Sequence, residues 1–155
     1  MSATKSEFYF SEDRSEALAA IESIAGGKGW CNILPRIVDD DVPDIHINFI
    51  GWTNRGITKA SFVTEAPKNA QPQPSSLGVL HSGGRVGRAR VTAMLEGAPY
   101  SIRQDHSQRG LILIVPPSAA SSEVLDVMCR FSSELCEYER AGGWRFELFE
   151  REERI

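Results

Sequence analysis

The stretch from residue 111 to residue 150 most constrains the fold, because its hydrophobic pattern changes period twice. It opens with five consecutive apolar residues, Leu111 to Val115, which two prolines end. Apolar residues then recur at spacings of four, three, four and three: Val124, Met128, Phe131, Leu135 and Tyr138. This order predicts a strand, a helix that begins at Ser121 or Ser122 and ends at Gly142-Gly143, and a second strand.

A shorter version of the same plan lies near the N-terminus. Phe8-Tyr9-Phe10 favours a strand, and Ser11 followed by two acidic residues is a typical helix start. The helix is predicted to run to Ala25, where a glycine pair ends it, and Trp30 opens the next strand. Trp30 and Trp144 follow the two glycine pairs at matching positions, so both are predicted to pack in or beside the core.

Between these two units the sequence is typical of strands and turns. Residues 45–52 and 57–64 alternate between apolar and polar side chains on either side of Asn54-Arg55-Gly56, which predicts a hairpin. The proline-rich segment 66–76 predicts an exposed loop. Residues 89–95 also alternate and are predicted to form a strand.

We therefore predict an α+β fold, with a mostly antiparallel sheet of six or seven strands and two helices packed on one face. Terminal β-α-β units bracket a β-meander in this arrangement. Residues 1–155 are predicted to form one globular domain with a solvated tail at 151–155. In general organisation, terminal helices that bracket a meander loosely resemble the layout of several small bacterial inhibitor or immunity proteins.

Composition indicates a soluble, cytoplasmic protein. Hydrophobic residues make up 41% of the chain and charged residues 25%, which is ordinary for a globular domain. No apolar run is long enough to cross a membrane. Cys31, Cys129 and Cys136 form no CxxC pair, so they are predicted to be reduced and mostly buried.

The net charge of −4 conceals an uneven distribution. Residues 51–110 carry eight Lys or Arg against three Asp or Glu, whereas the two flanking segments together carry nine against eighteen. If the flanking segments supply the helices and the middle supplies most of the sheet, the folded protein is electrically two-sided.

No motif assigns a catalytic residue, a metal site or a cofactor. His46, His81 and His106 are not paired in sequence with a nucleophile, and they are interpreted as structural. Asp39 to Asp41 with Asp44 lack the spacing of a calcium loop and are interpreted as a solvated turn. The sequence leaves enzymatic activity open and favours its absence.

The first functional hypothesis is a non-enzymatic binding protein of inhibitor, immunity or regulatory type. Strand alternation in the basic middle places polar residues on the uncovered sheet face, where Arg88 and Arg90 are expected to be the main anchors for an acidic protein partner. The predicted binding residues are Trp52, Lys59, Arg85, Arg88, Arg90 and Arg103. The alternative interpretation of this face is a solvated surface without a partner.

Two further hypotheses remain open. The Gly83-Gly84-Arg85 loop, with His81 or His106, has the residue types of an anion-binding or nucleotide-binding domain or a small enzyme. Single-stranded nucleic acid could stack on Trp52, although the scarcity of lysine and aromatic residues there and the acidic total count against it.

Overall fold

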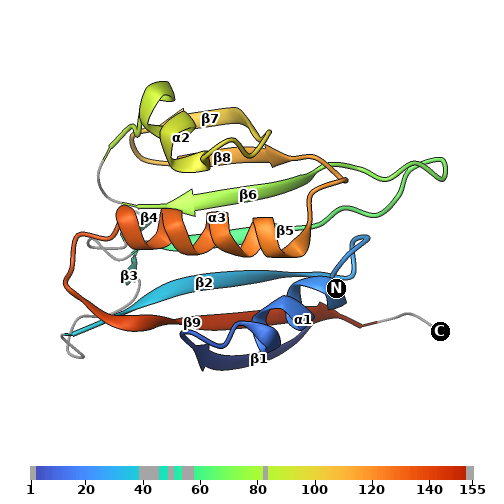
Figure 1. Ribbon diagram of the computed structural model, residues 1–155, viewed down its shortest axis with the longest axis horizontal. Helices are drawn as coiled ribbons and strands as arrows, with labels where there is room; N and C mark the ends of the chain where they lie inside the picture. Colours follow the sequence, from blue (N-terminus) through green and yellow to red (C-terminus); the bar gives the residue numbers. More distant parts are fainter. Residues whose placement is uncertain (1–2, 39–45, 49–50, 54–57, 82–83, 153–155) are drawn as a thin grey trace.

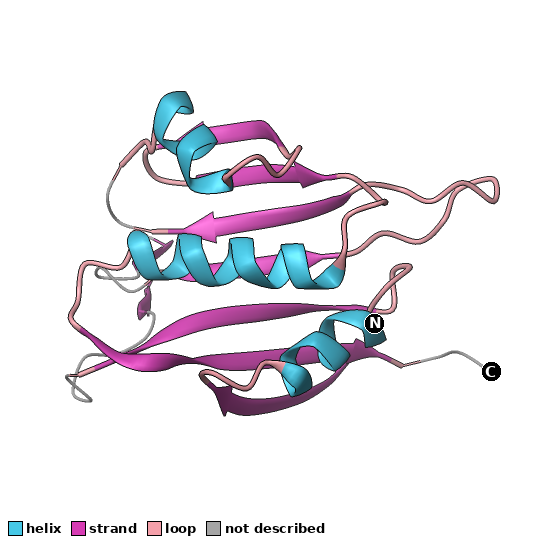
Figure 2. Ribbon diagram, viewed as in Figure 1, coloured by secondary structure: helices cyan, strands magenta, loops and turns pink. Residues whose placement is uncertain are grey.

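The computed structural model describes residues 3–38, 46–48, 51–53, 58–81 and 84–152, and these residues form nine strands and three helices. Seven strands make one large sheet: β1 (Ala3–Phe10), β2 (Gly29–Ile37), β5 (Lys59–Val63), β6 (Ser75–Leu80), β7 (Ser101–His106), β8 (Gly110–Val115) and β9 (Arg140–Arg151). The short strands β3 (His46–Asn48) and β4 (Gly51–Thr53) pair with each other. The helices are α1 (Ser15–Ser23), α2 (Arg88–Leu95) and α3 (Ser121–Glu134), and Figures 1 and 2 show all three on one face of the large sheet.

The strand order in the large sheet is β1-β9-β2-β5-β6-β8-β7, and every neighbouring pair is antiparallel. The C-terminal strand β9 lies between β1 and β2 and pairs with both (Figure 1). The α+β class and the antiparallel sheet are therefore confirmed, and the seven strands fall within the predicted six or seven. The predicted number of helices is one too small.

Helix α3 lies over the middle of the sheet, roughly along the strands (Figure 1), and supplies much of the core. Val124, Met128, Phe131 and Leu135 are buried, as their spacing predicts. The helix ends at Glu134, earlier than predicted, because β9 already begins at Arg140, which pairs with Ile37. With 14 residues it is the longest described helix, and none of the described helices is long and apolar enough to cross a membrane.

The segment from residue 88 to residue 95 is helix α2 and not the predicted strand. Its buried residues Val91, Met94 and Leu95 are three and four positions apart, which is helical spacing. Gly87 precedes the helix at φ 93°, and Glu96 ends it in the left-handed conformation. Eight residues are too few to separate the two periods by pattern alone, and the burial of Met94 fits only a helix.

The predicted hairpin between residues 45–52 and 57–64 is also incorrect. Strand β5 pairs with β2 and β6, while β3 and β4 pair with each other. The proposed turn at Asn54-Arg55-Gly56 lies outside the described residues, as does the acidic segment from Asp39 to Asp44. After β5 the chain makes a largely exposed arm that projects from the body, shown in green in Figure 1.

Cysteine burial agrees with the sequence prediction. All three thiols are free, with Cys31 and Cys129 buried and Cys136 half-buried. Burial raises the pKa of Cys31 and of Cys129 to about 12, so both thiols stay protonated and unreactive near neutral pH.

Phe131 is fully buried in the middle of α3, so its truncation tests how α3 packs on the sheet. Phe131→Ala is expected to lower the free energy of unfolding by about 3–5 kcal/mol, because it leaves a large cavity. The matched control is Glu134→Ala in the same helix, whose exposed side chain should change stability by less than about 0.5 kcal/mol. Equal effects of the two substitutions in urea unfolding would contradict this packing.

Candidate functional site

The face of the sheet opposite the helices, called here the open face, carries alternate residues of every strand. On β2 and β9 the core side holds Cys31, Ile33, Phe146 and Leu148. The residues between them therefore point to the open face. They include Trp30 and Asn32 on β2 and Glu147 and Phe149 on β9, which are paired across the two strands.

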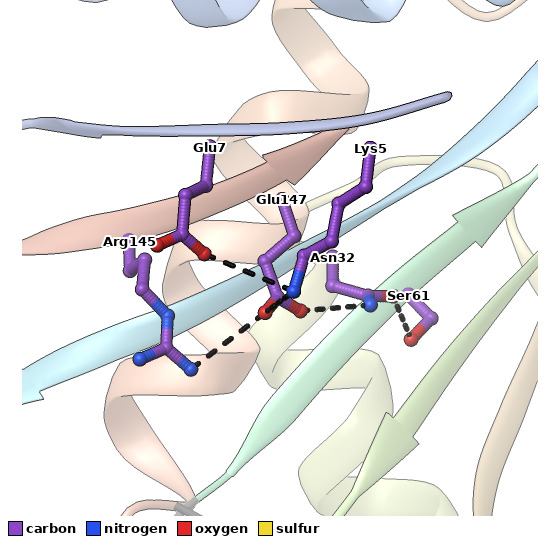
Figure 3. Close-up of polar contacts among 6 residues, drawn as sticks. All are labelled: Lys5, Glu7, Asn32, Ser61, Arg145 and Glu147. Atoms are coloured by element: carbon purple, nitrogen blue, oxygen red, sulfur yellow. Dashed lines mark hydrogen bonds and ion pairs between the residues drawn. The ribbon is translucent and has the colours of Figure 1, made fainter. Parts of the chain in front are cut away.

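Glu147 is the centre of a polar cluster on this face (Figure 3). Its side chain is only 12% exposed and lies 3.5 Å from Lys5 and 3.8 Å from Arg145. Asn32 donates a hydrogen bond of 3.0 Å to the same carboxylate and accepts one of 2.7 Å from Ser61. Four strands, β1, β9, β2 and β5, thus contribute to one network.

Aromatic residues lie beside this cluster, and cations cover their rings. The rings of Trp30 and Phe149 stack with centroids 5.0 Å apart and an interplanar angle of 7°. Lys5 lies 5.7 Å from the centroid of the Phe149 ring, and the Arg151 guanidinium lies 5.4 Å from that of Trp30. These contacts place positive charges against the negative faces of the rings.

A third aromatic residue, Tyr9 on β1, belongs to the open face because it pairs with Arg145. It is 60% exposed, and the Arg36 guanidinium lies 5.2 Å from its ring centroid.

Toward β7 the open face becomes apolar. Val63 on β5 and Ile112 and Ile114 on β8 are half-buried at open-face positions, which no described helix covers. Between Ser61 and Ile112 lies Gly78, where a Cβ atom would meet nothing within 4 Å. This part of the face is therefore an apolar surface with open space above Gly78.

The two faces of the molecule differ in charge. On the helix side, α2 carries Arg88 and Arg90, whereas α1 and α3 carry five acidic residues and one basic residue: Glu16, Glu22, Glu123, Asp126, Glu134 and Arg130. The part of the open face on β1, β2, β5 and β9 carries five cations against two carboxylates: Lys5, Arg36, Lys59, Arg145 and Arg151 against Glu7 and Glu147. Four of these five cations come from the chain ends and one from the predicted basic middle.

The structure separates the predicted binding residues. Lys59 lies on the open face, since its neighbour Ala60 is buried on the core side. Trp52 is in β4, and its side chain is outside what the structure describes. The other four, Arg85, Arg88, Arg90 and Arg103, are exposed around α2 and the edge strand β7 and are called here the arginine corner. Arg88 and Arg90 are not on the open face because their segment is helical.

The backbone just before α2, at the end of the Gly83-Gly84-Arg85 loop, already binds the carboxylate of Asp105. Asp105 accepts hydrogen bonds from the backbone N–H groups of Val86 at 2.8 Å and Gly87 at 2.7 Å. These groups are the ones that an anion at the start of α2 would use. His106 stabilises its own turn, because its Nδ1 accepts hydrogen bonds from the backbone N–H groups of Gln108 and Arg109.

His81 does lie near two arginines. It lines a cavity of about 150 Å³ together with Arg85, Arg90, Glu134 and Glu137. Burial lowers the pKa of His81, and Arg90 lowers it further, while Asp105 and Glu137 act in the opposite direction. In the part of the chain that the structure describes, no three His, Cys, Asp or Glu side chains are placed to hold a metal ion.

Sequence reasoning missed the Glu147 cluster and misplaced Trp30. Trp144 does pack beside the core, since it stacks on Phe10 and donates a 3.1 Å hydrogen bond to Ser133. Trp30 instead lies on the open face against Phe149. A signal was present for Asn32, which is the one polar residue in the apolar run from Trp30 to Leu34, whereas Glu147 belongs to an ordinary alternation of polar and apolar residues.

Glu147 tests whether the polar cluster stabilises the sheet. Glu147→Ala is expected to lower the free energy of unfolding by about 1–3 kcal/mol, because Asn32 and two cations lose a shared, largely buried acceptor. Glu7→Ala is the matched control on the neighbouring strand, where a half-exposed carboxylate should contribute less than about 0.5 kcal/mol. If both substitutions cost the same in chemical denaturation, the cluster does not stabilise the sheet.

His81 makes stability depend on pH. Its pKa in the folded chain lies below the ordinary value of 6.5, so the unfolded chain binds this proton more readily. The contribution of neutral His81 to the free energy of unfolding is therefore complete above pH 6.5 and is lost as the pH falls toward the pKa of His81 in the folded chain. NMR titration of the His81 imidazole should give a value below 6.5, and a value above it would contradict the structure.

Comparison with known proteins gives this chain no relatives from which a role could be transferred. No protein-family model matches it, and neither curated proteins nor solved structures include a significant match. The function is therefore argued from the residues of this chain.

Proposed function

We propose that this chain is a non-enzymatic binding protein that uses the open face to bind an acidic segment of another protein. The observation that carries the proposal is the excess of cations around partly exposed aromatic residues on a sheet face that the described helices leave uncovered. Antiparallel sheets commonly leave one face in water, but tryptophan, tyrosine and arginine are the residue types enriched at interface hot spots.

The charges on this face favour an acidic partner. Glu147 is already paired with Lys5 and Arg145, so it does not offset the remaining cations. Arg36 and Lys59 lie on the same face beyond these pairs and leave it positive, although the whole chain carries a net charge of −4. Complementary charge speeds association and excludes partners of the wrong sign.

Apolar contact adds to this electrostatic attraction. The half-buried residues Val63, Ile112 and Ile114 continue the open face next to the cationic part. A partner segment that combines carboxylates with apolar side chains matches both parts.

The contacts of the aromatic rings favour a protein over a single-stranded nucleic acid. Base stacking needs a free ring face. Phe149 is covered by Trp30 on one side and approached by Lys5, and Arg151 lies over Trp30. The ring edges and the cationic groups are what this surface offers, and protein side chains can contact both.

The anion-binding or enzymatic alternative has less support. Asp105 uses the N–H groups of the loop before α2, and two carboxylates share the His81 cavity with Arg85 and Arg90. A phosphate bound there would have to displace Asp105 from these N–H groups and would lie close to Glu134 and Glu137.

The test compares two charge-reversed proteins that carry the same change in net charge. The face variant combines Arg36→Glu with Lys59→Glu, and the corner variant combines Arg88→Glu with Arg90→Glu. Each should unfold within about 1 kcal/mol of the wild type, because partly or fully exposed charges contribute little. Partners are captured on the immobilised wild-type chain by crosslinking, purified, and titrated against all three proteins.

We expect the face variant to weaken partner binding by about tenfold or more and to reduce its salt dependence, with the corner variant close to the wild type. Loss of binding in the corner variant alone would locate the interface at Arg88 and Arg90. A partner that binds all three proteins equally would refute a charged interface on either surface.

A further inference from the structure

The large sheet has two edge strands, and they differ in how they resist pairing with another chain. Strand β7 has six residues, and its register with β8 shifts between Ile102 and Gln104. The exposed Arg103 sits in that irregularity. Short length, a bulge and a charge are the features by which edge strands avoid further pairing.

Strand β1 lacks the bulge and the short length. It has eight residues, contains neither proline nor glycine, and keeps an unbroken register with β9 from Ala3 opposite Arg151 to Phe10 opposite Trp144. In Figure 1 its outer edge lies at the bottom of the molecule, and no described element lies beyond it. A long, regular edge of this kind is a template for another strand.

The charges on β1 suit a second copy of the same strand. Lys5 and Glu7 both point to the open face, and their side chains are 51% and 50% exposed. If two β1 strands pair antiparallel about a two-fold axis at Ser6, Lys5 of each copy stands opposite Glu7 of the other. Opposite charges at directly paired positions stabilise a sheet, and a two-fold interface forms this pair twice.

The same register places a small residue beside the most exposed aromatic side chain. Tyr9, which is 60% exposed, would stand opposite Ala3 of the second copy, where the small side chain leaves room for the ring. On the helix side Thr4 would stand opposite Phe8. The axis is perpendicular to the sheet, so the helices of both copies stay on one side and the two open faces lie on the other.

We propose that two copies of this chain associate through β1 and join their seven-stranded sheets into one continuous antiparallel sheet. Pairing along one strand buries less surface than stable protein interfaces do, so the dimer is expected to form only at high protein concentration. This inference does not rest on the proposed function, because it uses the edge of the sheet and not a partner on the open face.

Cysteine crosslinking tests the register. In a Cys136→Ser background, Ser6→Cys places the new thiols directly opposite each other at the two-fold axis, within reach of a disulfide. Thr4→Cys is the matched control on the same strand and the same side, because the two Thr4 positions would lie roughly 14 Å apart along the strands. We expect mild oxidation to give a covalent dimer with Ser6→Cys and little with Thr4→Cys. Equal crosslinking, or none at Ser6, would overturn the proposal.

Charge exchange tests the pairing independently. Lys5→Glu and Glu7→Lys should each weaken dimerisation by about tenfold in sedimentation equilibrium, since each turns two attractive pairs into repulsive ones. The double exchange should restore dimerisation, and Arg103→Glu on the other edge should leave it unchanged.

Circular dichroism melting is measured for each variant to separate dimer loss from unfolding. A wild-type chain that stays monomeric up to roughly 1 mM, where even millimolar affinity would be visible, would overturn the proposal. A folded double exchange no better than the single ones would do the same.

Discussion

The rest of the structure depends on the insertion of β9 between β1 and β2. This strand has twelve residues and pairs along much of its length on both sides. Because β1 and β2 do not pair with each other, the two strands of the N-terminal β-α-β unit are joined within the sheet through the last strand of the chain. The unit β8-α3-β9 spans most of the sheet width, so α3 lies over the strands between β8 and β9 (Figure 1). Neither terminal unit can form its final sheet without the other.

The same insertion builds the candidate site. Phe146 and Leu148 of β9 enter the core, and the residues between and beside them must then face the other way. Glu147 is placed opposite Glu7 on one side and Asn32 on the other, and Lys5 and Arg145 offset the two acids. A carboxylate with two cations and an amide donor is satisfied in place, so the cluster keeps its geometry without a ligand.

The sequence predicted those parts of the fold in which local pattern decides the structure. The apolar spacing of α3 is long enough to exclude a strand, and the alternation at 57–64 correctly predicts β5. The similar alternation at 45–52 was misleading, because that stretch contains the separate strands β3 and β4. The sequence prediction failed at α2. There the alternation from Ala89 to Ala93 competes with the helical spacing of the buried residues Val91, Met94 and Leu95. Only packing against α3 separates the two. The strand order and register of β9 depend on contacts more than 100 residues apart in sequence, which leave no local trace.

The site prediction failed for the same reason. Strand parity placed Lys59 correctly because β5 is a strand, and it misplaced Arg88 and Arg90 because α2 is not. The basic middle of the chain therefore forms a corner, and the positive charge of the open face comes mainly from the two ends, through Lys5, Arg36, Arg145 and Arg151. Charge asymmetry along a sequence becomes asymmetry in space only through topology. Here the β9 insertion brings together cations that lie more than 100 residues apart, while the five acidic residues of α1 and α3 lie on the helix side. On strands β1, β2, β5 and β9 the open face of this acidic chain thus keeps few carboxylates, which leaves a positively charged surface with partly exposed aromatic residues.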